Sequence, residues 1–231
     1  MTETQPAKRQ FVSFRFLRVR PEWWRLDQPS RARAKEELAR LLEAARSKMI
    51  LLSYSTAGIR PECDLMFWGV SFRLEDFEEL GRDIHRTGFG QYLSPVYSYL
   101  SMTRRSLYID KISPEHGESR TRILPGKHKY LFVYPFVKTR EWYRLGLPER
   151  QAMMDEHIRT GNKYPSVKLN TTYSYGLDDQ EFVVAFETDE PADFLDLVME
   201  LRESQASRFT LRDTPTFTCV LKTFSELLSG Y

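Results

Sequence analysis

The most unusual side chain for its position is His157. It falls near the end of a segment with helical spacing, and Met153 and Met154 lie four and three residues earlier on the same expected face. A polar imidazole on such an apolar face has two interpretations. It is either a core histidine with a hydrogen-bond partner or an axial ligand of haem iron, for which a buried histidine on a rigid helix is well suited. The residues alone leave both open.

A second pair of candidate residues is Tyr134 and Lys138, in the segment Tyr-Pro-Phe-Val-Lys. The phenol can take part in redox chemistry, and the ammonium can hold a carboxylate. The alternative is an ordinary strand end with an exposed lysine. Arg120 and Arg122, in the polar segment before this strand, are either further anion contacts or solvated charges. His116 lies in the same segment, from which it could reach a nearby site.

Composition excludes several classes of function. The formal net charge is +2, whereas broad binding to nucleic acid or an anionic membrane needs a clear basic excess. Two cysteines without ligand spacing argue against a disulfide framework or a zinc site. The apolar runs are too short to span a membrane, and the polar N-terminus lacks the apolar region of a signal peptide. We therefore expect a cytoplasmic protein with no membrane span and no nucleic-acid partner.

An internal repeat organises these residues. The segment around Glu22-Trp23 recurs 119 residues later around Glu141-Trp142, and Pro29 matches Pro148 at the same spacing. At nearly the same spacing, residues 63–68 match 180–185 and residues 94–97 match 214–217. Four landmarks in one order indicate a duplication. Leu38, a core-facing position, is the counterpart of His157.

Hydrophobic periodicity predicts the same succession of strands and helices in each half. In the first half it is strand 11–19, helix 29–46, strands 49–55 and 64–72, helix 74–86 and strand 95–102. In the second half it is strand 129–137, helix 148–160, strands 167–175 and 181–187, helix 191–204 and strand 215–222. A tail helix is expected at 224–228.

These patterns predict an α+β fold built from two duplicated ferredoxin-like βαββαβ repeats. The expected boundaries are 10–103 for the N-terminal repeat, 104–128 for a connector loop, and 129–231 for a C-terminal repeat, which would bind haem if His157 is an iron ligand. Each sheet has one face covered by helices and one left bare. Packing the bare faces together would form a dimeric α/β-barrel-like body. A ligand would then fit between a sheet and its helices.

Several separated segments resemble the chlorite dismutase-like family of haem proteins, which includes the coproheme decarboxylases. They are residues 130–143 (YLFVYPFVKTREWY), 154–157 (MDEH), 164–165 with 170–171, 176–187 (GLDDQEFVVAFE) and 214–218. The resemblance covers roughly residues 130–220. The first half supports it through the duplication, because the family is built from two ferredoxin-like halves.

The resemblance implies a role for each matching residue. His157 matches the proximal iron ligand. Tyr134 matches the radical-forming tyrosine beside a reactive propionate, and Lys138 the lysine that helps to hold that propionate. Arg120 matches a propionate-binding arginine. The family usually forms rings of identical subunits, often pentamers, so the resemblance also implies a homo-oligomer.

The sequence departs from the chlorite-degrading members at one position. Those members carry a distal arginine on the strand after the histidine, where this chain has Leu169 with Asn170 beside it. The actinobacterial type of decarboxylase has an apolar residue followed by Asn-Thr here, which makes Leu169 and Asn170 candidate cofactor contacts. That type also uses a distal loop histidine, for which His116 is the matching candidate.

The resulting hypothesis is peroxide-dependent decarboxylation of coproheme III to haem b. The iron porphyrin would be both substrate and redox centre, and hydrogen peroxide the second substrate. Three alternatives stay open. They are chlorite dismutation on haem b, which the missing arginine disfavours, a non-enzymatic haem-binding protein, and a structural assembly without haem.

Overall fold

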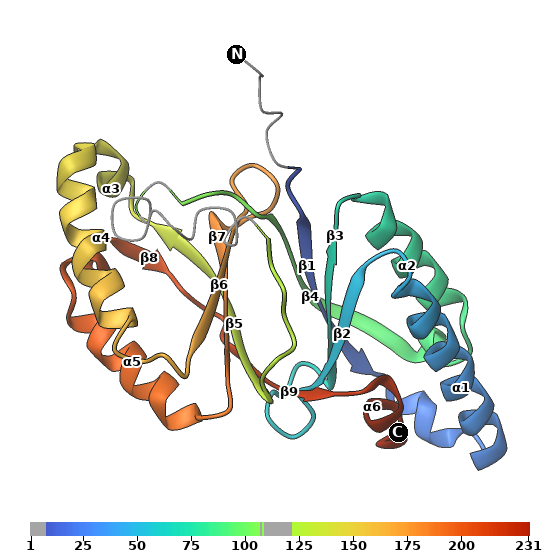
Figure 1. The fold of residues 1–231 in the computed structure, drawn as a ribbon. Helices are drawn as coiled ribbons and strands as arrows, with labels where there is room; N and C mark the ends of the chain where they lie inside the picture. The colour runs from blue at the N-terminus through green and yellow to red at the C-terminus, as the bar shows by residue number, and fades with distance from the viewer. Residues whose placement is uncertain (1–7, 107, 109–121) are drawn as a thin grey trace. The chain divides into compact units, whose positions relative to one another are not determined.

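The computed structural model describes residues 8–106, 108 and 122–231 (Figure 1). The chain divides into two compact units. We call them the N-terminal unit (residues 10–100 with 218–231) and the C-terminal unit (mainly residues 101–217). Each has antiparallel strands and helices, which confirms the predicted α+β class. None of the helices in the described ranges is both long and apolar enough to cross a membrane.

The N-terminal unit contains most of the first four strands. In chain order its elements are β1 (Phe11–Val19), η1 (Pro21–Arg25), α1 (Gln28–Ala45), β2 (Ile50–Ser55), β3 (Leu65–Ser71), α2 (Glu75–Arg86), η2 (Gly90–Tyr92) and β4 (Leu93–Met102). The strands are ordered β4-β1-β3-β2, with β9 (Phe217–Lys222) next to β2. The tail helix α6 (Phe224–Ser229) follows β9.

Local sequence explains where these elements begin. The Asp27 side chain accepts a hydrogen bond from the backbone N–H of Ser30 over 2.8 Å, and Pro29 occupies the first turn, so α1 starts here. Thr223 and Glu226 form a capping box at the start of α6. All of β3 is buried, as expected for a central strand.

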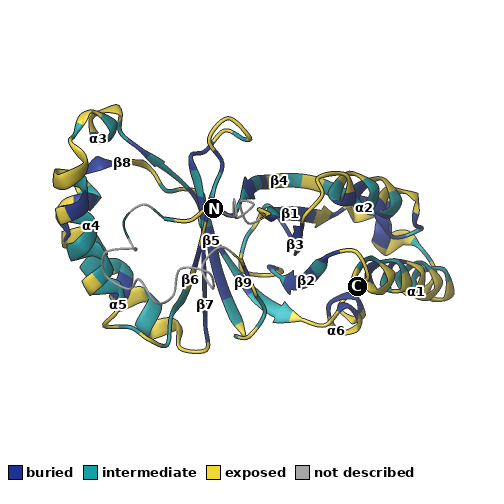
Figure 2. Cartoon of the chain, turned by 45° about the horizontal axis from the view of Figure 1, so that its top comes forward, coloured by how far each residue is buried: buried dark blue, intermediate teal, exposed yellow. Residues whose placement is uncertain are grey.

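The helices α1, α2 and α6 pack against the sheet of the N-terminal unit and enclose its core. Leu38 and Leu42 on α1 are completely buried there, together with Ile84 of α2 and Leu227 of α6. Figure 2 shows the same pattern, with the outward faces of α1 and α2 exposed. The prediction that Leu38 faces the core is therefore confirmed.

The C-terminal unit repeats this order of elements with short additions. Its elements are β5 (Tyr130–Lys138), α3 (Arg140–Arg144), α4 (Leu147–Gly161), β6 (Lys168–Tyr173), β7 (Phe182–Thr188), α5 (Pro191–Glu203), η6 (Gln205–Phe209) and β8 (Thr210–Arg212). Strand β7 pairs with both β6 and β5, and β5 also pairs with β8. All three pairings are antiparallel.

The predicted strands and long helices are all present, with ends that differ by up to about two residues. The short helices η1 and α3 were not predicted, because five residues are too few to display a helical period. They coincide with the recurring Glu-Trp segments. The duplication, the barrel-like body and the boundaries at 103 and 128 remain predictions. Residues 218–231 group with the N-terminal unit, where β9 pairs with β2.

Candidate functional site

Strand pairing places several of the candidate residues on one face of the C-terminal sheet. Leu169, Phe186 and Phe132 are directly opposite one another across three strands, and Thr171, Val184 and Tyr134 form the next row. Directly opposed residues share a face of the sheet. Phe132 and Phe186 form a cluster with Leu197 of α5, so this is the face toward the helices. We call it the helix-facing surface.

Tyr134 lies on this surface as a neutral phenol. Its ring stacks on Phe186, with ring centroids 6.0 Å apart. Burial raises the pKa of its hydroxyl well above its ordinary value of 10.0. Among the described residues, no group makes a hydrogen bond to this hydroxyl. The phenol therefore keeps its proton at neutral pH, and no described protein group competes for it.

Lys138 ends the same strand as a buried ammonium, not as an exposed lysine. The residue is only 8% exposed. Its Nζ donates to the carbonyl of Ala206 over 2.8 Å and lies 4.5 Å from the centre of the Trp142 ring. Burial lowers the pKa of this amine to about 8, opposed by the charge of Glu181. At neutral pH the group is thus a poorly solvated cation that would bind a carboxylate strongly.

The turn after Lys138 is held by a carboxylate that sequence reasoning missed. Glu181 accepts a hydrogen bond from the backbone N–H of Lys138 over 2.8 Å and from the hydroxyl of Tyr143 over 2.5 Å. Tyr143 also shares a hydrogen bond of 2.6 Å with Tyr175. The recurring Glu-Trp segment contains Trp142 and Tyr143, so the repeat was the available signal for them. For Glu181 there was no signal in the sequence, except that the residue lies in the segment 180–185, which matches residues 63–68.

His157 lies on α4 as a neutral imidazole. Burial, and then the nearby Lys138 ammonium, lower its pKa to about 4, while Glu156 opposes the shift. The residue is partly buried, and its predicted role as an iron ligand remains a prediction. Within the described residues neither ring nitrogen makes a hydrogen bond. A neutral imidazole with a free nitrogen is the form that binds a metal.

Helix α4 is less well packed than its counterpart α1. Within α4, all of whose residues are described, only Gln151 is buried. By contrast, α1 buries Leu38 and Leu42 completely. On the helix-facing surface, the side chain of Leu169 is 47% exposed. The unit therefore leaves apolar surface uncovered on the two elements that present His157 and Leu169.

Asn170 is not brought together with these residues. Asn170 faces away from Leu169 and Tyr134, because successive strand residues alternate in direction. Its amide donates to the fully buried carboxylate of Glu187 over 2.9 Å. His116 and Arg120 lie outside the described residues, so their predicted roles remain predictions.

These residues fit an iron porphyrin. The imidazole of His157 supplies a neutral nitrogen for iron, the half-exposed Leu169 on the helix-facing surface suits an apolar ring, and Lys138 supplies a cation for a ring carboxylate. No group of three or more His, Cys, Asp or Glu side chains that could hold a metal ion occurs in residues 8–106, 108 and 122–231.

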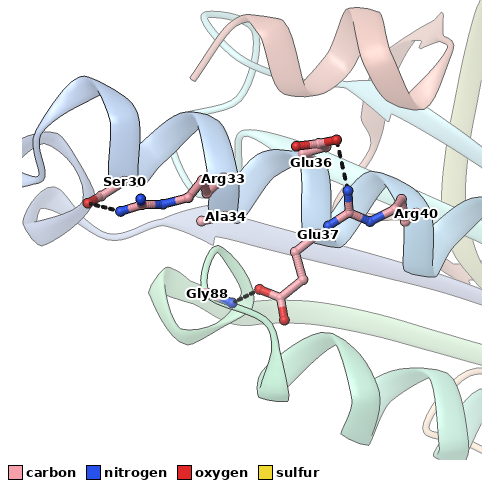
Figure 3. A pocket seen from close by; sticks show the side chains of 7 residues that line it. All are labelled: Ser30, Arg33, Ala34, Glu36, Glu37, Arg40 and Gly88. Carbon is pink, nitrogen blue, oxygen red and sulfur yellow. Dashed lines mark hydrogen bonds and ion pairs between the residues drawn. The ribbon is translucent and has the colours of Figure 1, made fainter.

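Two cavities of the N-terminal unit lie elsewhere. The larger, about 570 Å³, runs along α1 beside Gly88, where Glu36 pairs with Arg40 and Glu37 accepts from the backbone of Gly88 (Figure 3). It is lined by exposed charged side chains, of which Glu36 and Arg40 form an ion pair, and it contains none of the candidate residues. The smaller, about 40 Å³, lies between β1, β3 and α2.

Comparison with known proteins points to one family. A family model described as Chlorite dismutase matches residues 31–222. The chain is 33% identical over 193 residues to the coproheme decarboxylase of Mycolicibacterium smegmatis, covering 81% of this chain and 80% of that protein. It is 26% identical over 223 residues to the chlorite dismutase of Ideonella dechloratans, covering 94% of this chain and 78% of that protein.

Two solved structures have folds similar to that of this chain. The chlorite dismutase from Candidatus Nitrospira defluvii in complex with imidazole superposes with a TM-score of 0.87 at 27% identity, covering 96% of this chain and 94% of that one. A haem-binding protein from Thermus thermophilus superposes with a TM-score of 0.85 at 25% identity, with the same coverage.

Proposed function

The chain belongs to the chlorite dismutase family, and we propose that it is a coproheme decarboxylase that uses hydrogen peroxide to convert coproheme III to haem b. The observation that carries the proposal is the position of Tyr134. It is a partly buried, protonated phenol without a described partner, on the strand that ends in the buried cation Lys138. The relative in Mycolicibacterium smegmatis, named a coproheme decarboxylase, supports it.

Each residue has a separate task. His157 would bind the iron through its neutral imidazole, and Lys138 would hold a propionate carboxylate by a charge-assisted hydrogen bond. An iron porphyrin bound here would supply the reaction with peroxide and hence the oxidising equivalents. Tyr134 would give up its hydroxyl hydrogen as a proton and an electron, and would then take a hydrogen atom from the propionate. Its burial keeps the phenol from losing its proton to solvent beforehand.

The overall change balances for each propionate. The propionate, one hydrogen peroxide and one proton give a vinyl group, carbon dioxide and two water molecules. Two propionates react in turn, so the pigment loses about 46 Da twice, the mass of carbon dioxide and two hydrogens each time.

The test is a titration with ferric coproheme followed by hydrogen peroxide, with the pigment mass measured after each addition. The wild type should show both losses. Tyr134→Phe should bind coproheme with an unchanged absorption spectrum and show neither. Tyr130→Phe is the matched control, because Tyr130 lies on the same strand and the same face as Tyr134. Full conversion by Tyr134→Phe would end the proposal.

The alternative functions predict different results with the same purified protein. Oxygen evolution from chlorite by the haem b complex would indicate a chlorite dismutase, as several related structures are. The chain has no arginine in residues 167–175 that matches the family's distal arginine. Tight haem b binding without a mass change of coproheme would indicate a carrier or sensor. Unchanged haem spectra in His157→Ala would indicate that the protein has no haem site at His157.

The remaining parts of the proposal come from the family resemblance. We propose two duplicated ferredoxin-like repeats, an assembly of identical subunits, with five as the expected number, and a cytoplasmic location. The element order repeated in both units supports the duplication. Sedimentation of the purified protein would measure the number of subunits.

A further inference from the structure

Strand β1 directs two polar side chains toward helix α2. Ser13 and Arg15 are two residues apart and therefore share a face, the one on which they pair with Gly69 and Phe67 of β3. Both line the smaller cavity of the N-terminal unit, which has a volume of about 40 Å³. A water molecule needs roughly 10–15 Å³ of such space. The cavity is therefore large enough for one small ion and too small for an organic ligand.

The remaining walls of this cavity are apolar. They include Leu51 and Phe67 from the sheet and Phe77 and Ile84 from α2. Apolar walls do not solvate an ion, so any ion here depends on the two polar side chains. The larger groove of Figure 3 differs, because it contains both acidic and basic side chains and its Glu36 and Arg40 form an ion pair.

The cation in this cavity has no acidic partner. Arg15 is half-buried, and among the described residues no carboxylate lies within ion-pair distance of its guanidinium. Its hydrogen bond is to Nε2 of His85 over 3.2 Å, a neutral acceptor in that arrangement. The hydroxyl of Ser13 likewise has no partner among the described residues. Buried charges in proteins are normally paired or bound to an ion.

Two glycines let α2 approach closely enough to form the cavity. A methyl group at Gly81 would overlap the Arg15 guanidinium, and one at Gly69 would lie 2.8 Å from the Phe77 ring. The guanidinium is the far end of a flexible side chain, so Gly81→Ala would displace it without moving the backbone. The position of Arg15 is thus set by the absence of a side chain at Gly81.

We propose that Arg15 and Ser13 form a binding site for a small monovalent inorganic anion of halide size. One guanidinium balances one negative charge, and Arg15 and Ser13 can donate N–H and O–H hydrogen bonds to the same ion. The cavity volume excludes phosphate esters and larger carboxylates. The position of Arg15 is 119 residues before Tyr134, so both units carry a chemically active side chain at the matching place in their first strand.

Bromide is the probe, because it can be located by anomalous X-ray scattering and replaces chloride. Crystals grown in sodium bromide should show a bromide within hydrogen-bond distance of the Arg15 guanidinium. In solution, the line width of chloride by ³⁵Cl NMR should increase with protein concentration and return to that of free chloride when bromide competes.

Three variants distinguish anion binding at a specific site from nonspecific electrostatic attraction of anions. Arg15→Gln should weaken anion binding about tenfold or more, since a charge-assisted hydrogen bond is lost. Gly81→Ala should do the same while the protein remains folded by thermal unfolding. Arg18→Gln, an exposed arginine on the same strand, should leave binding unchanged. The proposal is wrong if wild-type crystals show no bromide at Arg15, or if Arg15→Gln and Gly81→Ala both bind chloride as the wild type does.

Discussion

The side-chain amide of Asn170 donates a hydrogen bond to the carboxylate of Glu187 over 2.9 Å, and that carboxylate is completely buried. Glu187 also accepts from the backbone N–H of Gly126 over 2.6 Å and lies 3.6 Å from the ammonium of Lys168. Lys168 in turn donates to the carbonyl of Leu124. Asn170 thus belongs to a group that ties residues 124–126 to strands β6 and β7.

We expect substitutions of the neighbours Asn170 and Leu169 to have opposite effects. Asn170→Ala should lower the free energy of unfolding by about 1–3 kcal/mol, because Glu187 loses a hydrogen bond in a buried place. It should leave the absorption spectrum of bound coproheme unchanged. Leu169→Ser should change that spectrum with little loss of stability, since Leu169 is half exposed on the helix-facing surface. Chemical denaturation and absorption spectra measure both.

One outcome would instead support the prediction that Asn170 contacts the cofactor. If Asn170→Ala alters the coproheme spectrum while stability is unchanged, the amide contacts the pigment and not primarily Glu187.

Lys138 should contribute to binding carboxylates and not to stability. The pKa of its amine is lowered from 10.5 to about 8 by burial, so at pH 7 the charged form is less favourable in the folded than in the unfolded protein. Lys138→Met should therefore keep the free energy of unfolding within about 1 kcal/mol of the wild type or raise it. Its affinity for ferric coproheme should fall about tenfold or more.

Two controls test this prediction. One is a pigment without carboxylates, and the other is the substitution of a second lysine. The iron complex of the coproporphyrin methyl ester, which has no carboxylate, should bind wild type and Lys138→Met equally. Lys129→Met, at an exposed lysine just before β5, should bind ferric coproheme normally. Equal affinity of Lys138→Met and wild type for ferric coproheme would show that Lys138 holds no propionate.

The imidazole of His157 should make the pigment-free protein less stable in acid. Its pKa is about 4 in the folded protein, against 6.5 ordinarily, so between these values the unfolded chain binds a proton that the folded one does not. Stability is full above about pH 6.5, falls as the pH drops toward 4, and is constant below. The loss from this group is at most about 3 kcal/mol.

The measurement is urea denaturation of wild type and His157→Leu between pH 7 and pH 4. Leucine is the residue at the matching position of α1, and it cannot be protonated. The stability of the variant relative to wild type should rise as the pH falls. His128→Leu, at a histidine paired with Asp189, should not reproduce that gain. Parallel profiles for wild type and His157→Leu would mean that His157 is solvated like an ordinary histidine.

Local patterns in the chain were sufficient for its elements and for part of the site. Alternation and helical spacing depend on neighbouring residues, so they predicted the strands and long helices with small errors at the ends. The Tyr-Pro-Phe-Val-Lys segment places Tyr134 and Lys138 on one strand, and a histidine at a leucine position marked His157 as a candidate ligand. The five-residue helices η1 and α3 and the carboxylate of Glu181 carry no such local signal.

Relations between distant segments came from the folded chain. Whether Asn170 meets a ligand or Glu187 depends on which face of β6 points toward the helices, and a strand pattern does not specify that face when polar residues occupy both. The field of the Lys138 ammonium at His157, and the carbonyl of Ala206 that holds it, join residues far apart in sequence. Such contacts are set by strand pairing and helix packing, and they shift the pKa values on which the chemistry depends.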